Sequence, residues 1–402
     1  MALARTLAPT TLEAFFSSYV ERQPLHIARN QPGYFDDAYA IGDVEDSLIV
    51  GAREPEYFCL VRTGQPELPV EEFTYERPGV RARLTGKASA RWLDARRIVA
   101  YYAEGYTLII KDAALFCARL QRFSNRLQRD LAAYVQPNVY LTPPQAQGFD
   151  VHHDTHDTLT AQIQGRKTWR IYEPLVELPL ESQPFAFKER PQDLKLVAQV
   201  DLNPGDTLYI PRGFPHEART SDDLSLHCTF ALAPIRIYDV LEILVRIAGD
   251  TDVSLRESLT PRLLGERALS ERLGALYRDR LEPALATDRV AIAVEIALDE
   301  LFRISRPNTS NAFAQTLLTR EIDTDTPIRL DDTVPFHIRG RNGIVEIAAA
   351  GKVVVLPGTC APALAALQAG PTTAGAMDPG LSPADRYALV KRLVVEGLVI
   401  IG

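Results

Sequence analysis

The pattern of apolar and polar positions divides the chain into a mixed first part, a β-rich middle part and a helical last part. Residues 11–16 begin an amphipathic helix, and residues 124–134 have the character of a helix end. Between 138 and 230, short apolar segments are separated by Gly, Pro and Asp, which predicts strands. Closely spaced short strands favour an antiparallel sandwich or barrel, so we expect an α+β protein with a mainly β core. The predicted strands cover residues 139–141, 159–164, 168–172, 207–210 and 224–232.

Helical periodicity replaces the strand pattern after Pro234. Apolar positions recur at helical spacing from 237 to 248, and Gly249 is expected to end that helix. The other elements predicted here are helices at 270–280 and 288–304 and a connection at 308–325.

The end of the chain combines strands with one well-marked helix. Ser382 is a good N-cap and Pro383 suits the first helical position, so a helix is predicted to start there and to end at Gly397. A helix followed by a strand is typical of a compact terminal module such as a winged helix. The predicted strands cover residues 343–348, 352–356 and 398–401.

Charge and cysteine content narrow the classes of protein that remain. With 402 residues and a net charge of -8, the chain is not expected to coat nucleic acid or an anionic membrane. No leader-like segment or membrane span is recognised, so we expect a soluble, cytoplasmic protein. The four cysteines have no paired spacing, which fits reduced thiols rather than disulfides.

Candidate chemistry is concentrated in a histidine-rich segment, because five of the seven histidines lie between 152 and 227. If residues 148–157 form a strand, the side chains of His152 and Asp154 point to the same face. His216 follows a buried strand and a Pro/Gly turn that can present it to the same place. Two histidines and one carboxylate with open positions are typical of non-haem Fe(II) oxygenases.

Other interpretations of this segment stay open on spacing alone. A histidine two residues before an aspartate is common on protein surfaces without any metal. Zinc also accepts two histidines and an aspartate. His156 would share the strand face of His152 and Asp154, so it can replace one of the assumed ligands.

A basic pair next to the predicted metal site suggests a second ligand. A 2-oxoglutarate cosubstrate needs a cation for its distal carboxylate. Lys167 follows a turn and alternates with Thr168, so its side chain can face inwards while Arg166 faces solvent. The alternative is that both bases are solvated at a hairpin turn.

The order and spacing of a whole set of residues resemble the ribosomal-oxygenase group of JmjC/cupin hydroxylases. The matching segments are Asn138–Pro144, Gln147–Phe149, His152–Asp154, Gln162, Gly165–Lys167, Trp169–Arg170, Ile210–Gly213 and His216. The resemblance implies a double-stranded β-helix barrel, a helical dimerisation region and a C-terminal winged helix. The implied boundaries are 1–235 for the barrel with its N-terminal helices, 236–307 for the dimerisation region and 326–402 for the winged helix.

The same resemblance implies roles for individual residues. Iron would be held by His152, Asp154 and His216, and the distal carboxylate of 2-oxoglutarate by Lys167. Trp169 is expected in the core. Residues expected to line the cosubstrate and substrate pocket or to surround the metal are Asn138, Tyr140, His156, Arg212, His227 and Thr229.

The resemblance also implies the reaction. Fe(II), 2-oxoglutarate and dioxygen would hydroxylate a residue side chain of a protein or peptide, with succinate and carbon dioxide as products. Val151, the polar residues after Asp154, and Ala231 depart from the family pattern, which leaves the substrate open. A precursor peptide or small metabolite is therefore an alternative substrate.

An alternative of another class is a ligand-sensing regulator that binds DNA through its C-terminal module. Residues 326–402 contain seven Lys and Arg against six Asp and Glu, which is a weak positive balance for phosphate binding. We therefore expect no nucleic-acid partner.

Overall fold

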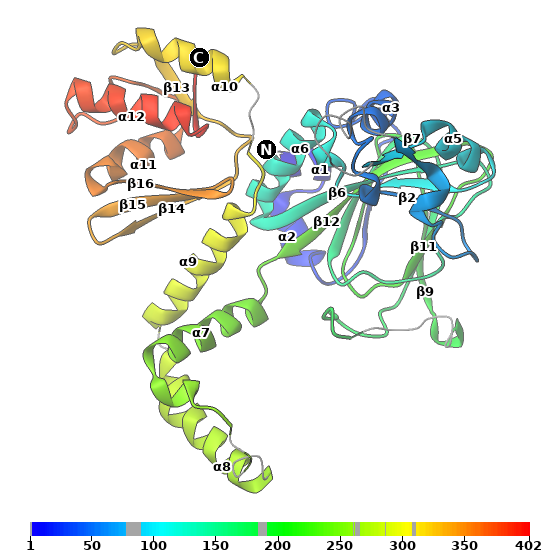
Figure 1. The fold of residues 1–402 in the computed structure, drawn as a ribbon, viewed down its shortest axis with the longest axis horizontal. Coiled ribbons are helices and arrows are strands. Elements are labelled where there is room, and N and C mark those ends of the chain that lie inside the picture. Colours follow the sequence, from blue (N-terminus) through cyan, green and yellow to red (C-terminus); the bar gives the residue numbers. More distant parts are fainter. Residues whose placement is uncertain are drawn as a thin grey trace. The chain divides into compact units, whose positions relative to one another are not determined.

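A computed structural model describes residues 2–77, 90–183, 191–259, 261, 266–285, 287–307 and 311–402. The chain divides into two units, Met1–Ala233 and Pro234–Gly402, which are described separately below (Figure 1). No helix in these ranges is both long and apolar enough to cross a membrane. All four cysteines are free and buried, as their spacing predicts.

The main sheet of the first unit confirms the predicted antiparallel β core. Its strand order is β1-β10-β7-β12-β6-β5-β2. β10 has the predicted bounds. The other predicted strands of this sheet correspond to β6, β7 and β12, whereas β1, β2 and β5 were not predicted. The neighbours β1 and β10, β10 and β7, β7 and β12, β6 and β5, and β5 and β2 run antiparallel. The strands are β1 (Leu25–Ile27), β2 (Phe58–Val61), β5 (Thr107–Ile110), β6 (Ala133–Thr142), β7 (Asp157–Gly165), β10 (Thr207–Ile210) and β12 (Ser225–Pro234).

A second, smaller sheet has the order β11-β8-β9. Its strands are β8 (Lys167–Tyr172), β9 (Leu196–Leu202) and β11 (His216–Arg219). Burial alternates along β8, so that Lys167 and Trp169 are buried whereas Arg170 is exposed. This alternation follows from the strand geometry, in which successive side chains point to opposite faces. The face of β8 that carries Lys167 and Trp169 is the buried one. A cavity lined by residues of both sheets lies between them.

The described α-helices of the first unit all precede β6 in the chain. The side-chain oxygen of Thr11 accepts a hydrogen bond from the Ala14 backbone N–H and caps α2, as residues 11–16 predict. Phe15 of that helix packs edge-on against Tyr209 of β10. The helices and the remaining hairpin are α1 (Ala2–Leu7), α2 (Leu12–Ser18), α3 (Ile41–Val50), α5 (Ala95–Ala103), α6 (Ala118–Leu131), β3 (Thr74–Arg77) and β4 (Ala90–Leu93).

The prediction of a helix continuing to residue 134 is wrong at its end. Helix α6 stops at Leu131, and Ala132 takes a left-handed conformation with φ of 47°. The chain then enters β6 at Ala133 without a loop. The apolar positions near 134 therefore serve a strand, because a single left-handed residue is enough to end the helix.

The second unit begins with α7 (Ile237–Thr251), α8 (Glu266–Leu276) and α9 (Thr287–Arg303). Ile243 and Leu244 of α7 pack against Ala293 and Ala297 of α9 in a small core. Gly249 does not end α7 but lies inside it, since helix contacts outweigh the modest cost of one glycine. The predicted connection at 308–325 contains helix α10 (Ala312–Leu318); residues 308–310 lie outside the described ranges.

The remainder of the second unit has a core of its own, formed by two three-stranded sheets and two helices. Ser382 caps α12 by accepting a hydrogen bond from the Asp385 N–H, which confirms the predicted helix start. The helix ends at Val395, just before Gly397. The elements are β13 (Pro327–Leu330), β14 (Phe336–Arg341), β15 (Ile344–Ala349), β16 (Lys352–Pro357), α11 (Ala361–Ala369), β17 (Thr372–Thr373), α12 (Pro383–Val395) and β18 (Val399–Ile401).

Candidate metal centre

The two histidines predicted as ligands are joined through their backbones. The N–H of His152 donates to the carbonyl of His216 at 3.2 Å, and the N–H of His216 donates to the carbonyl of His152 at 2.8 Å. The prediction of a strand over 148–157 is wrong, because this segment forms only the isolated bridge at His152 and β7 begins at Asp157. His152 and Asp154 are therefore brought together by a bridge and a loop rather than by strand alternation.

The turn before β11 holds the segment that carries Asp154. The N–H of Gly213 donates to the Asp154 carbonyl at 3.0 Å. Gly213 has φ of +87°, and a Cβ there would lie 2.7 Å from both the Val176 carbonyl oxygen and Pro179 Cδ. Only glycine fits this backbone conformation and this close approach.

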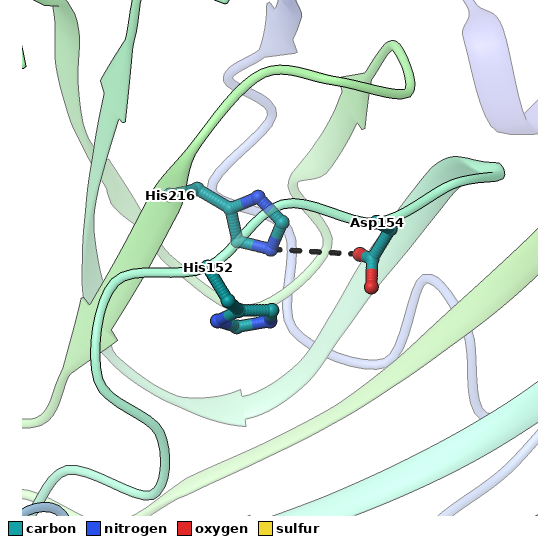
Figure 2. Close-up of side chains that lie close together, drawn as sticks. All are labelled: His152, Asp154 and His216. Carbon is teal, nitrogen blue, oxygen red and sulfur yellow. Dashed lines mark ion pairs between the residues drawn. The ribbon is translucent and has the colours of Figure 1, made fainter. Parts of the chain in front are cut away.

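The side chains of His152, Asp154 and His216 converge on one point (Figure 2). Their ligating atoms all lie within 4.8 Å of one another. Nε2 of His216 is 3.7 Å from Oδ2 of Asp154, and the two imidazole centroids are 4.6 Å apart. Two imidazole nitrogens and one carboxylate oxygen can hold a divalent transition-metal ion in this arrangement.

Backbone carbonyls orient both imidazoles in the same way. Nδ1 of His152 lies 2.9 Å from the Asp150 carbonyl oxygen, and Nδ1 of His216 lies 3.1 Å from that of Phe214. A carbonyl only accepts, so Nδ1 carries the proton in each ring and the lone pair of Nε2 is left for a metal. Such contacts fix the tautomer and the ring orientation of metal-ligating histidines.

The electrostatics of the cluster favour the forms that bind metal. Burial lowers the pKa of His216, which keeps its imidazole neutral. Burial by itself raises the pKa of Asp154, but the neighbouring histidines, His216 first, outweigh it and lower that pKa. At neutral pH the cluster therefore presents a neutral His216 imidazole and an ionised Asp154 carboxylate.

The cluster forms part of the wall of a cavity of about 120 Å³ between the two sheets. Nine of the ten residues predicted for the site line it. The lining residues that were not predicted for the site are Thr107, Gly148, Phe149, Thr158, Trp169, Ala218 and Ala231. Trp169 was expected in the core, and it is buried beside Ile171, although its ring also borders the cavity.

Lys167 lies in the same cavity and is buried, with 4% of its surface exposed, whereas Arg166 is exposed. Its ammonium donates to the Thr142 hydroxyl at 2.9 Å. No carboxylate of the described residues pairs with it, and burial lowers the pKa of Lys167 to about 7. A buried ammonium with one neutral partner is a ready site for an anion.

Aromatic rings form part of the same cavity wall. The imidazole of His227 stacks on Tyr140 with centroids 4.8 Å apart and an interplanar angle of 3°. Burial and the charge of Lys167 lower the pKa of His227 well below its ordinary value. His227 is thus a neutral wall residue and lies outside the three-residue cluster. Asn138, also in the wall, accepts a hydrogen bond at Oδ1 from the Asp112 N–H.

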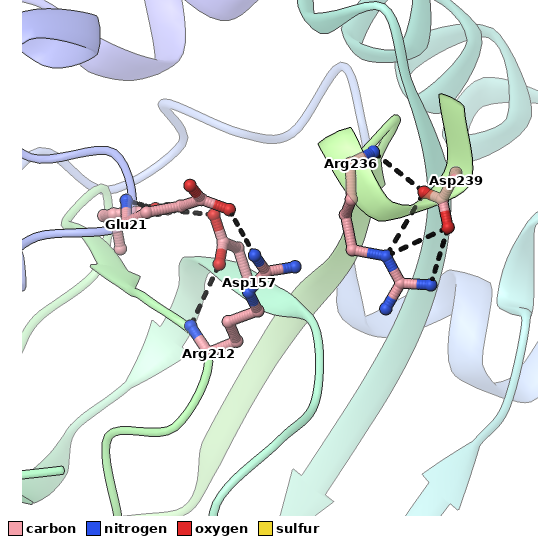
Figure 3. Close-up of polar contacts among 6 residues, drawn as sticks. Glu21, Asp157, Arg212, Arg236 and Asp239 are labelled. Atoms are coloured by element: carbon pink, nitrogen blue, oxygen red, sulfur yellow. Dashed lines mark hydrogen bonds and ion pairs between the residues drawn. The ribbon is translucent and has the colours of Figure 1, made fainter. Parts of the chain in front are cut away.

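Arg212 is the predicted residue that does not line the cavity. Its guanidinium pairs with Glu21 at 2.7 Å, and its backbone N–H donates to Oδ1 of Asp157 at 2.9 Å (Figure 3). Oδ2 of Asp157 accepts from the Tyr209 hydroxyl at 2.6 Å, and burial raises the pKa of Asp157. This network ties the start of β7 to the turn that leads to His216. Sequence reasoning missed Glu21, Asp157 and Tyr209, because nothing in their spacing links them.

Figure 3 also shows a contact at the start of the second unit. The backbone N–H of Arg236 donates to Oδ2 of Asp239 at 2.8 Å, which satisfies a backbone group at the N-terminus of α7.

Residues 115–240 match the JmjC domain family. The bifunctional lysine-specific demethylase and histidyl-hydroxylase NO66 of Drosophila persimilis is 29% identical over 263 residues, or 64% of this chain and 36% of that protein. Human ribosomal oxygenase 1 is 29% identical over 283 residues, or 69% of this chain and 41% of that protein. The chain thus spans less than half the length of these relatives.

Solved structures resemble the chain over nearly its whole length. The structure of ycfD from E. coli covers 98% of both chains with a TM-score of 0.57 and 16% identity. A structure of YcfD, a ribosomal oxygenase from Escherichia coli, in complex with cobalt and 2-oxoglutarate has a TM-score of 0.55, 13% identity and the same coverage. The chain therefore has the JmjC/cupin fold, with a mainly antiparallel β core and helices.

Proposed function

We propose, from the match of residues 115–240 to the JmjC domain family, that the protein is an Fe(II)- and 2-oxoglutarate-dependent oxygenase. Its substrate is a residue side chain of a protein or peptide. The observation that carries the proposal is one cavity that holds both a His-Asp-His cluster and a buried ammonium without a carboxylate partner among the described residues. The cluster alone would also suit zinc, whereas the ammonium calls for an organic anion beside the metal.

In this proposal His152, Asp154 and His216 hold the iron. The fit rests on the neutral His216 imidazole and the ionised Asp154 carboxylate, and on Nδ1 contacts that leave the Nε2 atoms of both histidines available to a metal. Three protein ligands leave further coordination positions for the cosubstrate and for dioxygen. The hydrogen bond from Gly213 to the Asp154 backbone keeps the carboxylate segment beside the histidines.

Lys167 binds the distal carboxylate of 2-oxoglutarate, with the Thr142 hydroxyl beside it. Asn138 and Tyr140 line the same cavity as Lys167 and the cluster. When bound, Fe(II) and 2-oxoglutarate use dioxygen so that one oxygen atom enters a substrate C–H bond as hydroxyl and the other enters succinate, with loss of carbon dioxide. The aromatic rings of Tyr140, Trp169 and Phe149 exclude water from this space.

A protein or peptide substrate is supported by the names of the relatives. One is a ribosomal oxygenase and another is a histidyl-hydroxylase and lysine-specific demethylase. Both exceed this chain in length, so the substrate of this chain remains part of the proposal.

We also propose that residues 236–307 form a dimerisation region. Ile237, Leu241 and Val245 occur every four residues on α7 and are exposed, whereas Ile243 and Leu244 are buried against α9. Helix α7 thus has a second apolar stripe beyond the one that packs in its own unit. Light scattering of the wild-type protein and of Leu241→Asp tests this, with a monomeric wild type as the contrary result.

Two finer assignments complete the proposal. Residues 326–402 form a winged-helix-like module, supported by a separate core of short strands and helices α11 and α12. The cytoplasm is the proposed location, supported by four buried free thiols.

The experiment that tests the oxygenase proposal is anaerobic loading with Fe(II) and 2-oxoglutarate, followed by exposure to air and measurement of succinate. His152→Ala is expected to abolish succinate release, and Lys167→Ala to raise the 2-oxoglutarate concentration required. Arg166→Ala is the matched control, because its side chain is exposed on the same hairpin. Succinate release that persists in His152→Ala would contradict the proposal.

A further inference from the structure

The part of the cavity wall formed by β7 and β12 is polar but uncharged. Thr158 of β7 lies directly opposite Ala231 of β12 in the strand register, and Thr160 lies opposite Thr229. The hydroxyls of Thr160 and Thr229 are 2.9 Å apart and share a hydrogen bond. Thr158, Thr229 and Ala231 all line the cavity.

Two charged side chains line this cavity in the described part of the chain, and both have assigned partners. Asp154 belongs to the metal cluster, and Lys167 is the proposed partner of the cosubstrate. The positive charges of a bound dication and of the Lys167 ammonium are balanced by the negative charges of the Asp154 carboxylate and of a 2-oxoglutarate dianion. No carboxylate then remains in the lining to pair with a cationic substrate side chain.

A guanidinium or ammonium entering such a cavity would lose its hydration without gaining an anionic partner, which is strongly unfavourable. A neutral polar group can instead bond to hydroxyls and imidazoles. His156 also lines the cavity, and its buried Nδ1 has no hydrogen-bond partner among the described residues. That atom is a ready partner for an amide, a hydroxyl or a neutral imidazole.

We propose that the side chain this cavity admits is uncharged and polar, and that Thr158 and Ala231 exclude arginine and lysine because they place no carboxylate in the cavity wall formed by β7 and β12. This inference rests on the proposed function and narrows its substrate class. Thr158 and Ala231 act as specificity-determining residues, because they shape the wall and do not ligate the metal.

The test compares three small probes that each carry a chain of three carbon atoms: propionamide, propylguanidinium and propylammonium. The protein is loaded with Mn(II) and 2-oxoglutarate, and the paramagnetic relaxation of each probe's methyl protons is measured by NMR. We expect the enhancement for propionamide to exceed that of both cations by about tenfold or more, as an unpaired buried charge demands. Equal or larger enhancement for a cation, or no enhancement for propionamide, would overturn the inference.

Two variants sharpen this test. Thr158→Asp places a carboxylate in the wall and is expected to reverse the preference in favour of propylguanidinium. Thr158→Asn has the same shape without the charge and should keep the wild-type order. The wild-type comparison decides the inference by itself if Thr158→Asp folds poorly.

Binding of Mn(II) and of 2-oxoglutarate is measured on the same samples by electron paramagnetic resonance and calorimetry. If the wild type fails to bind Mn(II) or 2-oxoglutarate, the proposed function is refuted and this inference with it. Intact binding of both with a preference for cations would refute the inference alone.

Discussion

His152 and His216 exchange two backbone hydrogen bonds, of 3.2 and 2.8 Å, although they belong to separate segments of the chain. This bridge sets the distance between the two imidazoles before any metal binds. The third ligand is attached to the same frame through the hydrogen bond from Gly213 to the Asp154 carbonyl. The cluster is therefore held mainly by backbone contacts, which favours a preformed metal site.

The first prediction concerns metal affinity. His152→Ala removes one of three ligands and is expected to weaken Co(II) binding by more than about 100-fold, beyond what loss of an indirect contact costs. Isothermal titration calorimetry measures this dissociation constant. His153→Ala is the matched control, since His153 is adjacent but outside the cluster. Similar losses in both variants would argue against the assigned ligand set.

A second prediction follows from the backbone of Gly213. Gly213→Ala forces a Cβ against the Val176 carbonyl and Pro179 at a position with φ of +87°. We expect a loss of about 1–3 kcal/mol in the free energy of unfolding, together with weaker metal binding. Gly249→Ala is the contrasting control, because a Cβ at that helical position meets nothing within 4 Å. It should stabilise the protein by about 0.5–1 kcal/mol in urea unfolding.

A third prediction concerns the pH dependence of cosubstrate binding. The pKa of Lys167 is lowered to about 7 by burial, and 2-oxoglutarate binds the protonated form. Above pH 7 the lysine must take up a proton on binding, so the dissociation constant should rise about tenfold per pH unit. Calorimetry at pH 8 in buffers of different ionisation enthalpy should detect uptake of close to one proton. Binding that is unchanged between pH 7 and 9 would contradict the role of Lys167.

A fourth prediction separates stability from function at the same residue. The pKa of Lys167 lies below its ordinary value of 10.5, so the unfolded chain binds more protons between pH 7 and 10.5. The free energy of unfolding of the wild type therefore gains a contribution that rises with pH across that window. At pH 6 the folded protein must bury a charged Lys167, which lowers the free energy of unfolding. Lys167→Met removes this cost and should stabilise the protein at pH 6 by about 1–4 kcal/mol, while 2-oxoglutarate binding is lost. Urea unfolding at pH 6 and 9 measures the stability, and calorimetry measures the loss of 2-oxoglutarate binding.

A fifth prediction concerns the network behind the metal cluster. Asp157 accepts hydrogen bonds from Tyr209 and from the Arg212 backbone, both in buried surroundings. Asp157→Asn turns one acceptor oxygen into a donor and should cost about 1–3 kcal/mol of unfolding free energy. Asp201→Asn, at an exposed position of β9, should change it by less than about 0.5 kcal/mol. Equal effects of the two substitutions would show that the network adds nothing to stability.

The local elements were predictable because their signals are local. The strand at 207–210 and the helix start at Ser382 were predicted where the structure has them, since burial pattern and capping act within a few residues. The buried side of Lys167 follows from strand alternation in the same way. Gly249 and residues 132–134 were misread because contacts with other elements outweighed weak local preferences.

The sequence by itself determined which residue types could hold a metal and an acidic cosubstrate, and it singled out His152, Asp154, His216 and Lys167. Only the tertiary structure decided how they meet: through a backbone bridge and a glycine turn instead of the strand expected at 148–157. It also decided that Arg212 faces Glu21 rather than the cavity. The physical reason is that burial and pairing of polar groups depend on segments far apart in the chain, which no periodicity or spacing records.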